Sequence, residues 1–237
     1  VNEQKCFLLI GNSRWHWAIQ KDQKWIFSHT SPIDNTKQSF PVPIKNWAAV
    51  GSIPNHLYLD PLKEIHIKDI PLLKVPPWIG IDRVLGGWGA FKKAKKKGIH
   101  KKGIIVADAG TIFSVTKITS NGEFDGGQLL PGIKLQQSAM THGTKNLQQS
   151  EKIIVPKDKF PVITQEAMIM GSIQSLLGVL MQIKNETNMP IWLCGGDSSL
   201  LFEELKQRNA DVVHHPNLVL EGMTSISDEI NPIQDQK

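Results

Sequence analysis

One short stretch of the chain constrains its fold and chemistry more than any other. Residues 104–107 are apolar and partly β-branched, which is typical of a strand buried on both faces. Asp108, Gly110 and Thr111 follow at once. Glycine permits a tight bend and a close approach, and a carboxylate beside a hydroxyl suits a cation and phosphate oxygens. The alternative is an ordinary strand–turn–strand in which Asp108 is a turn residue.

A second stretch repeats this pattern about one hundred residues earlier. Residues 7–10 are apolar, Gly11, Asn12 and Ser13 follow, and residues 14–19 are apolar enough for a returning strand. Two such loops facing each other would hold a polyphosphate between two lobes. That arrangement is the one used by the actin-like, sugar-kinase-like ATPases.

Composition predicts a globular protein outside any membrane. The chain has 237 residues, of which 40% are hydrophobic and 21% charged, and no apolar run approaches the roughly 20 residues that span a bilayer. No basic segment leads into an apolar core with a cleavage site, so we expect a cytoplasmic location. Cys6 and Cys194 are far apart in sequence and are expected to be buried thiols.

The net charge of +5 raises the question of nucleic-acid binding. Its main source is one lysine cluster at the end of a predicted helix: Lys92, Lys93, Lys95, Lys96, Lys97, Lys101 and Lys102. Lysines there complement the helix dipole and keep the surface hydrated, and no aromatic residues alternate with them as in a single-strand-binding groove. We therefore expect no nucleic-acid partner.

Periodicity and turn residues predict an α/β chain with two lobes. The expected strands are 5–10, 14–20, 24–29, 47–53, the apolar run 104–107, 112–118, 190–196 and one near Val212. The expected helices begin at Ile81, at Pro131 (to about Met140), at Thr164 as N-cap (to about Lys184), at Ser198, and after Asn217. A meander followed by alternating strands and helices predicts the actin-like, ribonuclease-H-like plan of mixed sheets flanked by helices. The expected lobes are 1–102 and 103–237.

A third motif opens the helix that begins at Ile81. Asp82 and Arg83 fall in its first turn, directly after Gly80. A helix N-terminus offers free N–H groups to an acidic ligand, and an arginine adds a forked donor for a carboxylate. The alternative is an aspartate placed for helix stability and an arginine in solvent.

Taken in order, these motifs resemble the type III pantothenate kinase family over nearly the whole chain. The set is Gly11-Asn12, Gly80-x-Asp82-Arg83, Asp108-Ala109-Gly110-Thr111, Gly126-Gly127 with Pro131-Gly132, Thr164 with Gly171, Gly195-Gly196, and the segment from His215 to Gly222. The resemblance implies transfer of the γ-phosphoryl group of ATP to the primary hydroxyl of pantothenate, the first step of coenzyme A synthesis. It also implies a homodimer that needs Mg²⁺ and a monovalent cation, K⁺ or NH₄⁺.

The resemblance also implies roles for individual residues. Asp82 would be the catalytic base, and Asp108 would hold the potassium ion. The pantothenate site would be lined by Gly80, Ile81, Arg83, Thr164 and the aromatic Trp78. ATP would be bound by Gly11, Asn12, Ser13, Gly110 and Thr111. Phosphoryl transfer asks mainly for positioning and charge neutralisation, which glycine loops, cations and one carboxylate supply.

The sequence departs from the family pattern at the first loop. The family carries an aspartate two residues before Gly11, where this chain has Leu9, and a threonine where it has Ser13. Cys194 and Thr116 replace two further family residues, a threonine and an acid. Two rival interpretations follow: a non-catalytic relative that acts as a regulator or binding module, and a different phosphotransferase or phosphatase of the same fold.

Overall fold

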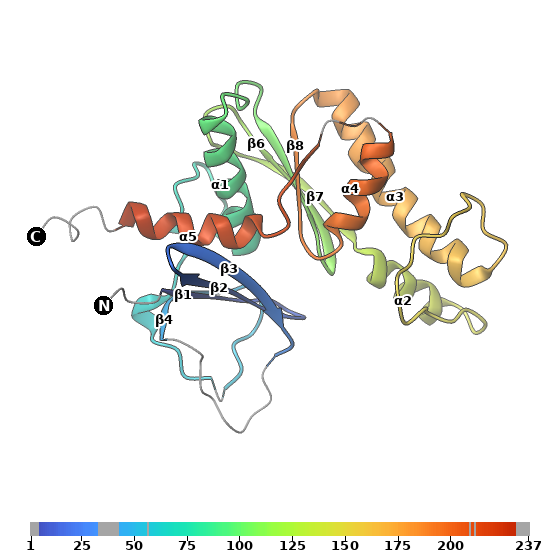
Figure 1. Ribbon diagram of the computed structural model, residues 1–237, viewed down its shortest axis with the longest axis horizontal. Helices are drawn as coiled ribbons and strands as arrows, with labels where there is room; N and C mark the ends of the chain where they lie inside the picture. The colour runs from blue at the N-terminus through green and yellow to red at the C-terminus, as the bar shows by residue number, and fades with distance from the viewer. Residues whose placement is uncertain (1–4, 33–42, 56, 209, 211, 231–237) are drawn as a thin grey trace, which may run out of the picture. The chain divides into compact units, whose positions relative to one another are not determined.

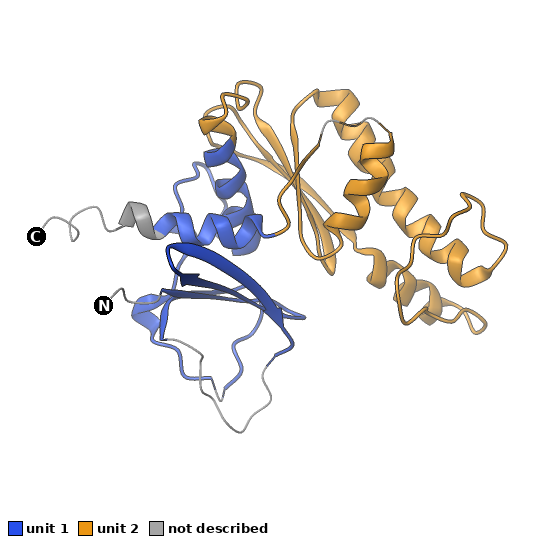
Figure 2. Cartoon of the chain, viewed as in Figure 1, with its two compact units in different colours: residues 1–93, 217–237 blue, residues 94–216 orange. Residues whose placement is uncertain are grey.

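The chain divides into two compact units, shown in different colours in Figure 2. The computed structural model describes residues 5–32, 43–55, 57–208, 210 and 212–230. One unit comprises residues 1–93 and 217–237, and the other comprises residues 94–216. These units differ from the lobes expected from the sequence, 1–102 and 103–237, because the C-terminal helix packs in the first unit.

The first unit is built on a four-stranded mixed sheet in the order β3-β2-β1-β4 (Figure 1). The strands are β1 (Cys6–Ile10), β2 (Trp15–Lys21), β3 (Lys24–Thr30) and β4 (Ile44–Ala49). The first three form the expected antiparallel meander, and β4 lies parallel to β1. Every residue of β1 is buried, because both faces of the sheet are covered.

One face of this sheet covers a tryptophan-rich core. Its buried members are Cys6, Leu8, Ile10, Trp15, Trp17, Ile44, Trp47 and Leu57. The other face packs against α5 (Leu218–Ile230), which contacts β1 and β2 and lies beside α1 (Ile81–Lys96) in Figure 1. Alternate residues of β1 therefore serve two different layers.

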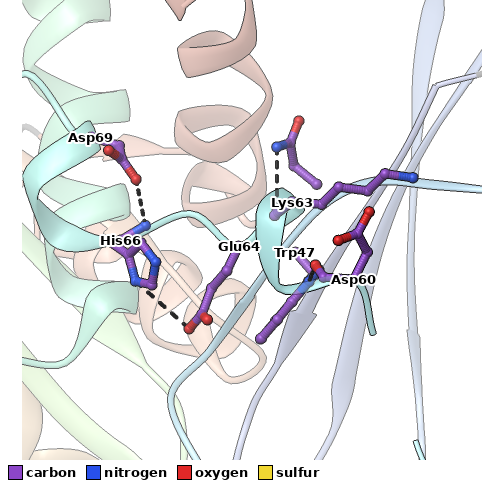
Figure 3. Close-up of polar contacts among 7 residues, drawn as sticks. Trp47, Asp60, Lys63, Glu64, His66 and Asp69 are labelled. Atoms are coloured by element: carbon purple, nitrogen blue, oxygen red, sulfur yellow. Dashed lines mark hydrogen bonds and ion pairs between the residues drawn. The ribbon is translucent and has the colours of Figure 1, made fainter. Parts of the chain in front are cut away.

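The edge of the first sheet beyond β4 is closed by a short irregular segment (Figure 3). Glu64 forms an isolated parallel bridge with Trp47, and the Trp47 indole N–H donates to the Asp60 carbonyl oxygen at 2.8 Å. On either side of Glu64 lie two 3₁₀ turns, η1 (Pro61–Lys63) and η2 (Ile67–Asp69). Pro61 stands at the first position of η1, where no N–H is needed.

Two glycines allow α1 and α5 to cross at very short range. A Cβ on Gly222 would overlap the Leu85 carbonyl oxygen, and a Cβ on Gly89 would lie 2.8 Å from the Leu218 carbonyl oxygen. Lys93 and Glu221 add an ion pair of 3.0 Å between the same helices. The crossing holds α1, with the Asp82 motif at its start, against the first sheet.

The second unit repeats the same strand plan with one strand more. Its sheet has the order β7-β6-β5-β8-β9, formed by β5 (Ile104–Ala109), β6 (Ile112–Ile118), β7 (Phe124–Pro131), β8 (Ile191–Cys194) and β9 (Val212–His214). The first three strands are an antiparallel meander, and β8 lies parallel to the first of them. Each unit therefore begins with three meandering strands and adds parallel strands beside the first.

Helices α2 (Ile133–Gly143), α3 (Thr164–Thr187) and α4 (Ser198–Gln207) belong to the second unit. Apolar residues of α3 and α4 share one buried cluster with alternate residues of β5, including Ile105, Ala107 and Ala109. By length and composition α3 also passes as a membrane span, but half of that stretch is buried, as in the core helix of a folded domain.

Several element boundaries differ from those expected. Pro131 ends β7 instead of starting a helix, and Gly132 is the N-cap of α2. Thr164 is the first residue of α3, whose N-cap is Ile163. The apolar run expected as a strand over 47–53 starts earlier and ends earlier, as β4, because residues 50–53 leave the sheet.

Candidate functional site

The Asp82 carboxylate is held at the start of α1 by its own helix. The Arg83 backbone N–H donates to Asp82 Oδ1 at 2.8 Å. A Cβ on Gly80 would lie 2.5 Å from the same oxygen, so a side chain at position 80 would have to displace the carboxylate. Glycine at position 80 of the Gly80-x-Asp82-Arg83 motif therefore leaves room for the Asp82 carboxylate.

Burial changes the acid–base properties of this pair. Loss of solvent raises the pKa of Asp82 above its ordinary value, against the lowering effect of the Arg83 N–H and guanidinium. Burial also lowers the pKa of Arg83, against the opposing effect of the Asp82 charge. A carboxylate with a raised pKa that is fixed by a backbone donor has the properties of a general base.

The loop after β1 forms a tight turn in the first unit. The Gly11 N–H donates to the Arg14 carbonyl oxygen at 3.0 Å, which returns the chain directly into β2. Asn12 and Ser13 are exposed at the tip. A Cβ on Gly51 would lie 2.6 Å from Asn12 Oδ1, so a second glycine, after β4, leaves room for the amide of the first loop.

In the second unit Asp108 lies near the end of β5, beside the Gly195-Gly196 turn. Asp108 is in register with Ser114 on β6 and with Cys194 on β8. Gly195 has φ +92°, and a Cβ on it would overlap both Asp108 Oδ1 and the Ala109 backbone. This close approach requires glycine at position 195, and it makes the turn after β8 one wall of the space around the carboxylate.

A third segment joins this end of the sheet through Gly132. Its N–H donates to the Thr111 carbonyl oxygen at 2.9 Å, and a Cβ on it would overlap the Gly110 carbonyl oxygen. The Asp197 N–H donates to the Ala109 carbonyl oxygen at 2.9 Å. Three loops far apart in sequence therefore meet around residues 108–111, and Thr111 is exposed there.

Sequence reasoning missed a supporting pair behind the Gly195 turn. The Ser198 hydroxyl donates to the Gly195 carbonyl oxygen at 2.6 Å and lies 3.0 Å from His214 Nε2. Ser198 is fully buried, and the His214 ring stacks on Phe202. The neighbouring His215 stacks on Trp192 instead, as expected for adjacent strand residues. The pair holds the turn in place.

The remaining residues predicted to bind substrate lie at element starts and in a loop. Ile81 is the first residue of α1 and its side chain is buried, so only its backbone can line a site. Trp78 is 85% exposed in the loop before Gly80. Thr164 is exposed at the start of α3. Trp78 and Ile81 belong to the first unit with Asp82, and Thr164 belongs to the second with Asp108.

The described residues contain no group of three or more His, Cys, Asp or Glu side chains that would chelate a metal ion. Asp108 is instead one carboxylate among loop backbone groups, in a space that a Cβ at position 195 would fill. One carboxylate with oxygen neighbours fits a hard cation and not a soft transition metal. The expected potassium site is compatible with this donor set.

Comparison with known proteins gives one consistent family. The model of the family "Type III pantothenate kinase" matches residues 69–186, which include the Asp82 and Asp108 motifs. The type III pantothenate kinase of Synechococcus elongatus is 28% identical over 94% of this chain and 96% of its own length. That of Thermosynechococcus vestitus is 28% identical over 84% and 80%.

Solved structures give the fold. A conserved putative Baf family transcriptional activator from Campylobacter jejuni has a TM-score of 0.62 at 19% identity, covering 96% of this chain and 100% of its own. The activator of 2-hydroxyisocaproyl-CoA dehydratase from Clostridium difficile, solved with ADPNP bound, has a TM-score of 0.53 at 11% identity, covering 99% of each chain. The fold is that of the actin-like ATPases, and both the family model and the curated relatives that this chain matches are type III pantothenate kinases.

Proposed function

We propose that the chain phosphorylates pantothenate with ATP, giving 4'-phosphopantothenate, the first step of coenzyme A synthesis. The observation that carries the proposal is the carboxylate of Asp82, fixed by the Arg83 N–H and given room by Gly80. The family match adds the substrate class.

In the proposed reaction the primary hydroxyl of pantothenate attacks the terminal phosphorus of ATP. The new P–O bond forms as the bond to the ADP oxygen breaks, and the hydroxyl proton passes to Asp82. The Arg83 guanidinium binds the pantothenate carboxylate as a forked donor. Trp78, Ile81 and Thr164 line the remainder of the substrate.

The two glycine loops bind the nucleotide in this proposal. Backbone N–H groups at Asn12 and Ser13 and at Gly110 and Thr111 donate to phosphate oxygens, which costs no reorganisation during the reaction. Gly11 contributes the tight turn of the first loop, because its own N–H donates to the Arg14 carbonyl oxygen. Asp108 would hold a monovalent cation, K⁺ or NH₄⁺, whose charge would offset that of the phosphates, and Mg²⁺ would accompany ATP.

Assembly and location follow the family in the proposal, as a cytoplasmic homodimer. The apolar side chains of α3 are accounted for by the core of their own unit. These side chains therefore need no second subunit to cover them, and sedimentation of the purified chain tests whether it forms a dimer.

The proposed function is tested by ADP release from the purified full chain with ATP, Mg²⁺, K⁺ and pantothenate. We expect pantothenate-dependent turnover, which falls when Na⁺ replaces K⁺ and returns with NH₄⁺. Asp82→Asn should lose this turnover. Its matched control is Asp125→Asn, because Asp125 is an exposed aspartate that pairs with Lys117. Turnover that is indifferent to pantothenate would refute the proposed substrate, and turnover indifferent to the cation would remove Asp108 from its role.

A further inference from the structure

The ring of His16 lies at the first loop, opposite the position where the family acid is missing. On β2, His16 pairs with Leu9 of β1 on one side and with His29 of β3 on the other. Residues paired directly across strands have neighbouring side chains on one face of the sheet. A Cβ on Gly11 would lie 3.1 Å from His16 Nε2, so this nitrogen faces the glycine of the loop.

Two further side chains fix the direction of this ring. His16 Nδ1 lies 2.7 Å from His29 Nδ1, and His29 Nε2 lies 3.1 Å from Asn217 Oδ1 at the start of α5. An amide oxygen only accepts, so His29 donates from Nε2 and accepts at Nδ1. His16 must then donate from Nδ1, which leaves its Nε2 as a bare lone pair toward Gly11 in the neutral ring.

Leu9 is buried and apolar, with an exposed fraction of 3%, and it can bind neither a cation nor a phosphate. A phosphoryl group bound at this loop therefore has to be contacted by another side chain. We propose that His16 does so directly, donating from Nε2 to a phosphate oxygen in place of the family acid, with His29 and Asn217 as positioning residues. The inference rests on the proposed function for its ligand, a nucleotide phosphate.

The arrangement couples phosphate binding to the uptake of one proton. Burial first, then the neighbouring His29 and Arg14, lower the pKa of His16 to about 4, so the free ring is neutral. The neighbouring segments contribute the apolar Leu9 from β1 and the uncharged Asn217, which directly precedes α5 and contacts His29. A bound phosphate favours the imidazolium, which donates from both nitrogens and keeps the contact with His29 unchanged.

The direct test is NMR of the histidine ring nitrogens in the full chain, with and without Mg²⁺ and a non-hydrolysable ATP analogue. The His16 signals are assigned by their loss in His16→Gln. We expect them to move on binding from the pattern of a neutral Nδ1–H ring to that of a doubly protonated ring. His66, an exposed histidine of the same unit, serves as the internal control.

Calorimetric affinities across pH give the second measurement. His16→Ala should weaken binding of the analogue by about tenfold to a hundredfold, the range for a hydrogen bond to a charged group. His16→Gln keeps an N–H donor and should recover part of this loss without its pH dependence. Because binding raises the pKa of His16, wild-type affinity relative to His16→Gln should rise as pH falls from neutral toward 4.

His29→Leu separates a positioning role from a structural one. The variant removes the acceptor that keeps the proton on His16 Nδ1, so the neutral ring gains access to the Nε2–H form. We expect binding to remain while part of its pH dependence is lost.

Three results would overturn the inference: His16 signals that do not respond to the analogue, affinity in His16→Ala equal to wild type, or no binding of the analogue at all. Failure of the proposed function is distinguishable from the first two results. A chain that shows the His16 response but leaves pantothenate unphosphorylated retains the phosphate contact and loses only the proposed substrate.

Discussion

Gly195 and Asp108 lie so close together that a Cβ on the glycine would overlap the carboxylate oxygen. They come from two parallel strands, β5 and β8, whose ends meet in the second unit. Two conditions make this contact possible: Gly195 adopts a positive φ, and its missing side chain leaves space for Asp108. Ser198 and His214 hold the turn in place.

Gly195→Ala should therefore cost stability and displace Asp108. Strain at a positive φ contributes about 1–2 kcal/mol, and the overlap adds to it. Gly126→Ala is the matched control, since Gly126 has φ +83° but nothing within 4 Å of its would-be Cβ. Urea unfolding of both variants measures the difference, and equal losses would contradict the described contact.

Gly80→Ala should lower kcat without unfolding the first unit. The new Cβ would lie 2.5 Å from Asp82 Oδ1, and a carboxylate can rotate away, so the free energy of unfolding should change by less than about 1 kcal/mol. Its effect on kcat should vanish in the Asp82→Asn background, as a double-mutant cycle shows for coupled residues. Additive effects in the cycle would mean that Gly80 acts independently of Asp82.

The raised pKa of Asp82 predicts a trade between stability and activity. A folded carboxyl with a raised pKa contributes stability below its unfolded pKa near 3.8, and this is lost as pH rises through the folded pKa. At neutral pH, Asp82→Asn should thus be more stable than wild type, although its turnover should be at least about a hundredfold lower. The advantage should shrink as pH falls toward 3.8, and urea midpoints across pH measure it.

The activity should depend on pH in the opposite direction to the stability contribution of Asp82. The base works only when Asp82 is ionised, so kcat/KM should fall as pH is lowered through the raised pKa. If the acid limb of the pH profile fell at the ordinary aspartate pKa in both wild type and Gly80→Ala, this would contradict the burial of the Asp82 carboxyl.

Gly222→Ala should destabilise the first unit, because its Cβ would overlap the Leu85 carbonyl oxygen at the crossing of α1 and α5. Overpacking of this kind costs typically about 1–3 kcal/mol. Gly178→Ala, at an exposed position of α3 with nothing within 4 Å, should instead stabilise by roughly 0.5–1 kcal/mol. Thermal unfolding of the two variants should shift in opposite directions.

The sequence predicted the strands that precede the glycine loops, because buried runs such as residues 104–107 carry a local signal. It also predicted the start of α1 at Ile81. The start of α2 was predicted wrongly at Pro131, since antiparallel pairing with β6 retains that proline as the last residue of β7.

Contacts between residues far apart in the chain left no local pattern in the sequence from which they could be predicted. The packing of α5 in the first unit depends on the crossing at Gly222 and Gly89, and neither glycine shows a turn pattern. The contacts of His16 depend on the register of three strands and on Asn217, 188 residues from His29. Histidines scattered along a sequence indicate such a network only once that register is known.

The most direct test of the proposed reaction is transfer of a labelled terminal phosphoryl group from ATP to pantothenate, followed by chromatography of the product. Wild type and Asp125→Asn should form labelled phosphopantothenate, and Asp82→Asn should lose at least about a hundredfold of that rate, the lower end for a general base. Equal rates in wild type and Asp82→Asn, or label that never reaches pantothenate, would contradict the assignment of this reaction to Asp82.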